Sequence, residues 1–125
     1  MGPAENCAVV FNGLVEDYLC LRWIARCGYS TIYLIVPLRA YCDAVLKRVE
    51  ELRLQTFVVD LDNYVVAKNC LRYLYERYGI GVIAVSASCL TSVLERVCRE
   101  LGIVLRVLST PCYIPWSRVA TRTMV

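Results

Sequence analysis

The sequence contains no histidine and a single glutamine, Gln55. Without histidine it lacks the usual general base of thiol and serine enzymes and one of the two main zinc ligands. None of its cysteines form a C-x-x-C pair, so zinc ribbons and zinc fingers do not fit. The phosphate-binding patterns G-x-G-x-x-G and G-x-x-x-x-G-K-[ST] are also missing, which argues against dinucleotide and Walker-type sites. We therefore expect no metal and no cofactor, and we favour a protein that is not an enzyme.

Long apolar runs and strong charge are lacking too. No stretch approaches the ~18 apolar residues of a membrane span, and residues 1–6 do not have the layout of a secretory signal. The net charge is only +3, and arginines alternate with glutamates over 47–51 and 95–100, as on solvated helix faces. We expect a soluble cytoplasmic protein that makes no membrane contact, and DNA binding is not expected.

What the sequence has in excess is apolar side chain. Hydrophobic residues make up 58% of its 125 residues, against roughly 45–50% in typical soluble domains. A monomer of this size has too much surface to bury them all, so we expect a homodimer. The eight cysteines fall mostly on apolar positions, where a thiol behaves as a small hydrophobe, and their pairing stays open. Many cysteines and one glutamine suit a hyperthermophilic source or an archaeal virus.

Five strand-length apolar runs recur along the chain and predict an α/β fold. They span 7–11, 31–36, 56–61, 81–85 and 103–108, with helix-period segments between them. Continuous hydrophobicity is typical of strands covered on both faces. We predict a Rossmann-like doubly wound parallel sheet over residues 1–108, with strand order 3-2-1-4-5 favoured over 2-1-3-4-5. Residues 109–125 have no periodicity and are predicted to form an extended C-terminal arm on the domain or a partner.

The switch point of the favoured order lies between the first and fourth strands, where ligands of such sheets bind. Small and polar residues follow both strands and lead into helix N-termini, which favour anions. The predicted ligand-binding residues are Asn12, Gly13, Ser86, Ser88 and Thr91. The alternative for Ser88 is that it simply caps the fourth helix.

Three other features compete with this site. Asp60 and Asp62, at the end of the third strand, are candidates for Mg²⁺ or a ribose hydroxyl, although helix capping is the commoner role. Cys89, placed at the head of the fourth helix, is the best thiolate candidate but has no visible activating partner. The first helix, 14–27, is apolar almost all round and is predicted to expose a face that a second subunit covers.

Three elements of the sequence resemble a known family: the polar turn Asn12-Gly13, the strand 32–36 closed by Pro37, and the Ser/Thr-rich turn 86–92. Through these three elements and its predicted topology, the segment 7–108 resembles the CRISPR-associated Rossmann fold (CARF) family of ligand-sensing domains. The resemblance implies a homodimer that binds a cyclic oligoadenylate across its two-fold axis, with the five predicted site residues lining the pocket. Some members also cleave this ligand.

The sequence also departs from the family. Its usual Gly-Gly-Thr element appears as Ala87-Ser88-Cys89, neither loop has a lysine, and the usual C-terminal effector domain has no counterpart. We expect a small dimeric nucleotide-binding regulator with a ligand of the cyclic oligoadenylate type. The alternatives are a non-enzymatic interaction protein with an empty crevice and a thiol enzyme centred on Cys89.

Overall fold

The computed structural model describes residues 6–109, in which strands and helices alternate as the sequence predicts. All but one residue of the predicted arm lies outside this range. The strands are β1 (Asn6–Val10), β2 (Ile32–Pro37), β3 (Thr56–Val59), β4 (Ile80–Ser86) and β5 (Val104–Leu108). The α-helices are α1 (Val15–Ala25), α2 (Asp43–Leu52), α3 (Tyr64–Tyr78) and α4 (Ser92–Leu101), with short 3₁₀ turns η1 (Leu38–Ala40) and η2 (Ala87–Cys89).

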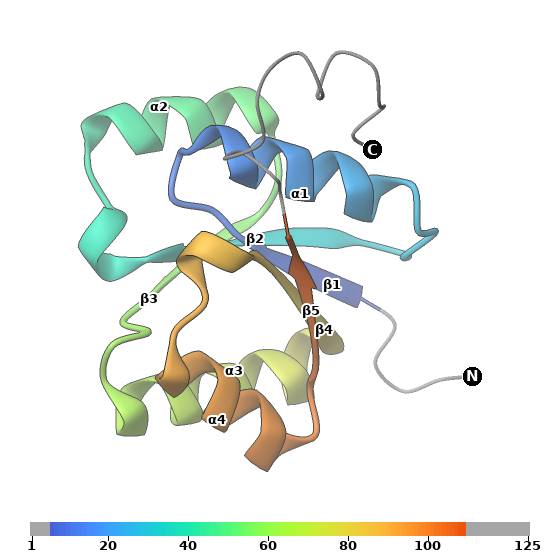
Figure 1. Ribbon diagram of the computed structural model, residues 1–125, viewed down its shortest axis with the longest axis vertical. Helices are drawn as coiled ribbons and strands as arrows, with labels where there is room; N and C mark the ends of the chain where they lie inside the picture. Colours follow the sequence, from blue (N-terminus) through green and yellow to red (C-terminus); the bar gives the residue numbers. More distant parts are fainter. Residues whose placement is uncertain (1–5, 110–125) are drawn as a thin grey trace.

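The five strands form one parallel sheet in the order β3-β2-β1-β4-β5, which confirms the predicted fold class and strand order. Helices α1 and α2 cover one face of the sheet, and α3 and α4 cover the other (Figure 1). Strand order reverses between β1 and β4, so the crevice of this fold lies at their carboxyl ends.

Strand β1 explains why the apolar runs do not alternate with polar residues. Its side chains are buried on both faces: Cys7 and Val9 join the core beneath α1 and α2, and Ala8 and Val10 join the core beneath α3 and α4. Burying a side chain of valine size contributes roughly 1.5–3 kcal/mol. The central strand therefore anchors two cores at once.

The helix starts correct two sequence predictions. Thr91, not Ser88, caps α4, because its Oγ1 accepts a hydrogen bond from the Leu94 N–H at 3.2 Å. Cys89 is not at the head of this helix either, since it belongs to η2 and lies before the cap. The predicted stop at Gly102 is confirmed, as this residue follows the last turn of α4.

Helix α1 exposes less apolar surface than its sequence predicts. Val15 is 73% exposed, and Leu14 and Tyr18 are exposed beside it, but all three lie at the start of the helix. Further along, Trp23 is half-buried, and the guanidinium of Arg106 from β5 lies 5.1 Å from its ring centroid. The exposed apolar surface of α1 is thus concentrated near its first turn.

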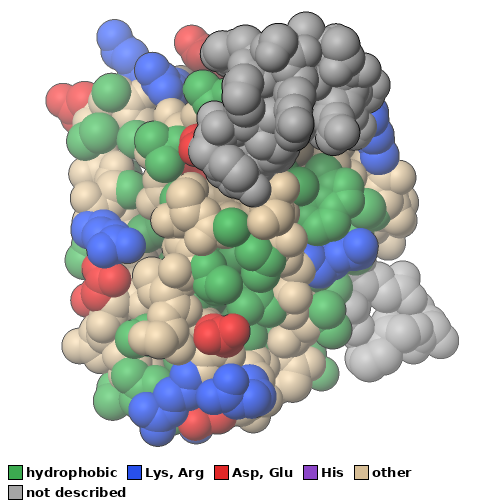
Figure 2. Space-filling view, viewed as in Figure 1, with side chains coloured by type: hydrophobic (Ala, Val, Ile, Leu, Met, Phe, Trp, Pro, Cys, Tyr) green, Lys and Arg blue, Asp and Glu red, His purple; other side chains and the backbone are tan. Residues whose placement is uncertain are grey.

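Figure 2 shows a second apolar surface, at the centre of the face that looks onto β5. This edge strand exposes Val104 and Val107. Below it, basic and acidic side chains lie together over α4, as the interspersed charges of 95–100 predict.

Candidate functional site

The site lies where β1 and β4 end side by side. Their register pairs Val9 with Ala84, and two further residues along each strand bring the chain to Phe11 and Ser86. Asn12 follows directly, so Asn12 and Ser86 lie at the same carboxyl edge of adjacent parallel strands. The predicted juxtaposition of these two loops is confirmed.

A buried carboxylate organises the first loop. Asp17, on the first turn of α1, is fully buried, and its Oδ2 accepts hydrogen bonds from the backbone N–H of Asn12 at 2.7 Å and of Leu14 at 3.0 Å. Asp17 is not among the site residues predicted from the sequence. The available signal was an acidic residue three positions after the helix cap, where it can bond back to the cap's N–H.

Burial raises the pKa of Asp17, and the hydrogen bonds from Leu14 and Asn12 oppose that shift. The carboxylate takes two N–H groups of the loop that an external anion would otherwise use. The expectation of free anion-binding N–H groups is therefore wrong for these two. A phosphate placed here would also meet a negative charge whenever Asp17 is ionised.

Polar side chains of the second loop reach across to Asp17. Ser86 is fully buried, and its Oγ lies 3.4 Å from the Oγ of Ser88. The Sγ of Cys89 lies 3.9 Å from the Ser88 Oγ and 4.0 Å from the Asp17 Oδ1. These contacts join the two loops in one polar cluster. The neighbours of the Cys89 thiol in it are acceptors or hydroxyls, which gives no cation to activate a thiolate.

Asn12 has hydrogen-bonding capacity left over. Its Nδ2 is the one buried side-chain nitrogen or oxygen within residues 6–109 that has no hydrogen-bond partner. A buried amide without a partner costs roughly 1–3 kcal/mol, so such groups call for an explanation. A bound ligand or an ordered water would supply the missing acceptor.

The turn after Asn12 depends on glycine and on a distant arginine. Gly13 has φ of +86°, and a Cβ at this position would lie 3.1 Å from Cγ2 of Val45. Arg48, on α2, donates from Nη1 to the Gly13 carbonyl at 2.8 Å. A guanidinium carries five N–H donors, so Arg48 brings a cation with spare donors to the edge of the site. Sequence reasoning missed it because it lies 35 residues away.

The remaining predicted residues play other parts. Thr91 uses one lone pair of its hydroxyl oxygen to cap α4, which leaves the hydroxyl hydrogen and the second lone pair for a ligand. Asp60 accepts from the Asp62 N–H at 3.1 Å, and Asp62 lies 3.6 Å from Arg39, so both stabilise the turn after β3. Within the described range, no cluster of three or more metal-ligating side chains forms.

The buried thiols are chemically quiet. Burial raises the pKa of Cys7, Cys20 and Cys98 to about 12, which keeps them protonated at neutral pH. All seven cysteines between residues 6 and 109 are free thiols. Three of the seven are therefore small core residues, as their apolar positions predict. Cys70 and Cys89 pack partly buried against the core, and Cys27 and Cys42 are exposed.

Comparisons with known proteins add no family. No family model matches the sequence, and no curated protein matches it significantly. In the part of the chain that is described, no helix is both long and apolar enough to cross a membrane.

Proposed function

We propose that the protein is a small homodimeric, cytoplasmic regulator that binds a nucleotide ligand in the crevice between β1 and β4. The ligand class is that of the cyclic oligoadenylates, as the CARF resemblance implies, and the binding residues are Asn12, Gly13, Ser86, Ser88 and Thr91. The observation that carries the proposal is the buried Asn12 Nδ2, which has no partner at the edge where such folds bind ligands.

The chemistry of the crevice suits a base or sugar better than a bare phosphate. An amide and two serine hydroxyls can donate to and accept from a nucleobase edge or a ribose hydroxyl. The Asp17 carboxylate lies beneath the first loop and disfavours an anion close to it. Arg48, at the rim through its bond to Gly13, is the group best placed to meet a phosphate.

Native mass spectrometry and calorimetry with cyclic and linear oligoadenylates of several lengths test the proposal. We expect Asn12→Ala and Ser88→Ala each to weaken binding about tenfold, the effect of losing one ligand hydrogen bond of roughly 1.5 kcal/mol. Ser30→Ala is the matched control, since Ser30 is exposed just before β2, at the opposite edge of the sheet. If all three variants bound with equal affinity, the ligand would have to bind at another site. If the natural chain bound no oligonucleotide, the proposal would be rejected.

The second candidate is an interaction protein whose crevice stays empty. It is favoured by Asp17, which already satisfies the loop N–H groups that a ligand would use. In that case Asn12→Ala would change nothing except stability, and function would reside on a surface. The thiol enzyme centred on Cys89 has no comparable support, because Asp17, Ser86 and Ser88 provide no cation.

A further inference from the structure

Among residues 6–109, no second strand pairs with the outer side of β3, which is therefore an open edge of the sheet. Parallel pairing joins β3 to β2 only, with the Leu34 N–H donating to the Gln55 carbonyl at 2.9 Å. Backbone groups alternate direction along a strand, so those of Thr56 and Val58 point away from β2. Proteins usually shield such edges with charge, proline or a bulge, because a bare edge pairs with another strand. The segment 54–59 reads Leu-Gln-Thr-Phe-Val-Val and has neither charge nor proline.

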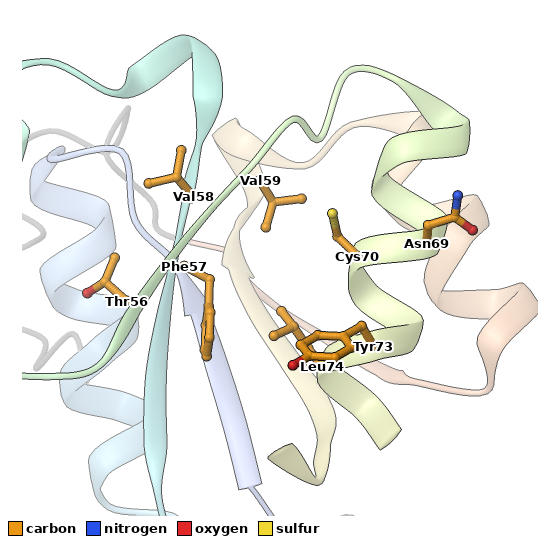
Figure 3. Close-up of a pocket in the computed structure, with 8 residues that line it drawn as sticks. All are labelled: Thr56, Phe57, Val58, Val59, Asn69, Cys70, Tyr73 and Leu74. Carbon is orange, nitrogen blue, oxygen red and sulfur yellow. The ribbon is translucent and has the colours of Figure 1, made fainter. Parts of the chain in front are cut away.

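Apolar hollows flank this edge on both faces of the sheet. Between β3 and α3, a hollow of about 470 Å³ receives Phe57 and Val59 opposite Cys70 and Tyr73, the last of these 56% exposed (Figure 3). Between β3 and α2, a smaller hollow of about 160 Å³ is lined by Val58, 45% exposed, together with the exposed side chains of Tyr41 and Leu46. The bare backbone edge thus lies between two largely apolar hollows.

We propose that this edge is the contact between two copies of the chain, with β3 pairing antiparallel to β3 of the second copy across a two-fold axis. When a two-fold axis passes between two antiparallel strands, one residue of the strand lies opposite the same residue of the second copy. Val58 suits this central position because both its N–H and its C=O point away from β2. The two Val58 residues then exchange two hydrogen bonds, and Thr56 of each copy lies opposite Asp60 of the other.

The charges that flank β3 favour antiparallel over parallel pairing with the second copy. Arg53 precedes β3, and Asp60 and Asp62 follow it. An antiparallel copy brings the acidic end of one strand to the arginine end of the other, whereas a parallel strand of the same sequence would bring like charges together. The contact is also closed: the β3 edge of each copy pairs with that of the other, so no free β3 edge remains for a third copy.

The other edge of the sheet is less suited to this role. Strand β5 carries Arg106 in its middle, a charged residue of the kind that blunts edge pairing. The β3 contact is also independent of the proposed ligand. Two strand spacings, roughly 10 Å, separate β3 from β1, so each copy would keep its own crevice and take its own ligand. That stoichiometry differs from the shared ligand implied by the family resemblance.

Light scattering and sedimentation of the full chain at micromolar concentration test the contact. We expect a mass of twice 14.2 kDa for the natural sequence and a monomer for Val58→Lys, which places two lysines on the axis. Val104→Lys, the same change at an exposed position of β5, is the matched control and should leave the dimer intact. A monomeric natural chain, or a dimer that survives Val58→Lys, would overturn the proposal.

Two further measurements keep the test valid if Val58→Lys fails to fold. Amide exchange of the natural chain should show protection of the Thr56 and Val58 N–H groups at high concentration and its loss on dilution. Arg53→Glu should weaken the dimer at least fivefold, and Asp62→Arg added to it should restore affinity. Exchange that does not change with concentration would refute the contact whatever happens at the crevice, and oligoadenylate titration of the same samples reports separately on ligand binding.

Discussion

The carboxylate of Asp17 accepts a hydrogen bond from the backbone N–H of Asn12 at 2.7 Å. This bond ties the first turn of α1 to the end of the central strand, and the same oxygen also accepts from Leu14. An isosteric amide can reproduce both bonds through its single carbonyl oxygen. The two substitutions Asp17→Asn and Asp17→Ala should therefore differ sharply.

We expect Asp17→Ala to lower the free energy of unfolding by about 2 kcal/mol or more, because two N–H groups lose their acceptor in a buried site. Asp17→Asn should cost little at neutral pH, since it keeps the acceptor and removes a desolvated charge. Urea denaturation of both variants measures the difference. Equal losses would mean that the charge itself, not the acceptor, stabilises the loop.

The pH dependence of the natural chain should reflect the same residue. Burial raises the pKa of Asp17 in the folded state, so the folded chain holds its proton to higher pH than the unfolded chain does. Stability associated with this group is then greatest below the unfolded pKa and falls as pH rises through the folded pKa. Asp17→Asn should remove that decline. An unchanged pH profile in the variant would contradict the direction of the shift.

Two glycines with nearly equal φ allow the cost of backbone strain to be distinguished from the cost of a steric contact. Gly13 has φ of +86° and Gly28 has φ of +83°, but an added Cβ meets Val45 at 3.1 Å only at Gly13. We expect Gly28→Ala to cost about 1 kcal/mol through backbone strain and Gly13→Ala to cost more, because Val45 must also shift. Thermal unfolding of both variants gives the comparison, and a smaller loss at Gly13 would exclude the contact with Val45.

Alkaline pH should destabilise the chain through its buried thiols. Cys98 has a folded pKa of about 12 against an ordinary value of 9.0, so above pH 9 the unfolded chain loses this proton first. Each such thiol lowers stability by about 1.4 kcal/mol per pH unit between these two values. Cys98→Val should reduce the slope measured by denaturation from pH 9 upward. Cys42→Val, at an exposed position, should leave the slope unchanged.

A surface cluster between α3 and α4 should matter at acid pH. Hydrogen bonds from Tyr64, Lys68 and Arg96 lower the pKa of Glu100 from 4.5 to about 2. The stability that this group contributes is present above pH 4.5 and is lost as pH falls towards 2. Tyr64→Phe should raise the Glu100 pKa, as followed by NMR titration, and Tyr73→Phe on the same helix should not. If Tyr64→Phe left the Glu100 pKa unchanged, the lowered pKa would be due to Lys68 and Arg96 instead.

Much of the fold could be predicted from the sequence because the central strands β1 and β4 are covered on both faces. Runs such as 7–11 and 81–85 have no alternative burial pattern, and right-handed crossovers leave few strand orders. The two loops of the crevice followed from that order alone. Local details were less accessible: the extra turn η2 moves the helix start from Ser88 to Thr91, and no periodicity reports a three-residue turn.

Arg48 could not be assigned to the site from the sequence because its partner, Gly13, is 35 residues away. For Asp17 the sequence offers a local signal for its bonds to Asn12 and Leu14, but not for its burial. A carboxylate on a helix is normally solvated, whereas Asp17 is fully buried and lies 4.0 Å from the Sγ of Cys89, 72 residues later. Arg48 belongs to a helix whose charged residues read as solvent-facing, and its contact with Gly13 depends on how α2 lies beside α1. Tertiary placement, not local pattern, decides the burial of Asp17 and the contact of Arg48.

The central place of β1 has a consequence for how the chain is made. On one side β1 pairs with β2, which is synthesised soon after it, but on the other side it pairs Asn6 with Ile80. A ribosome adding about 5–20 residues per second needs roughly 4–15 s to cover the 74 residues between them. During that interval the nascent β1 has one apolar flank without a neighbour, and chaperones that recognise extended hydrophobic segments have time to bind it.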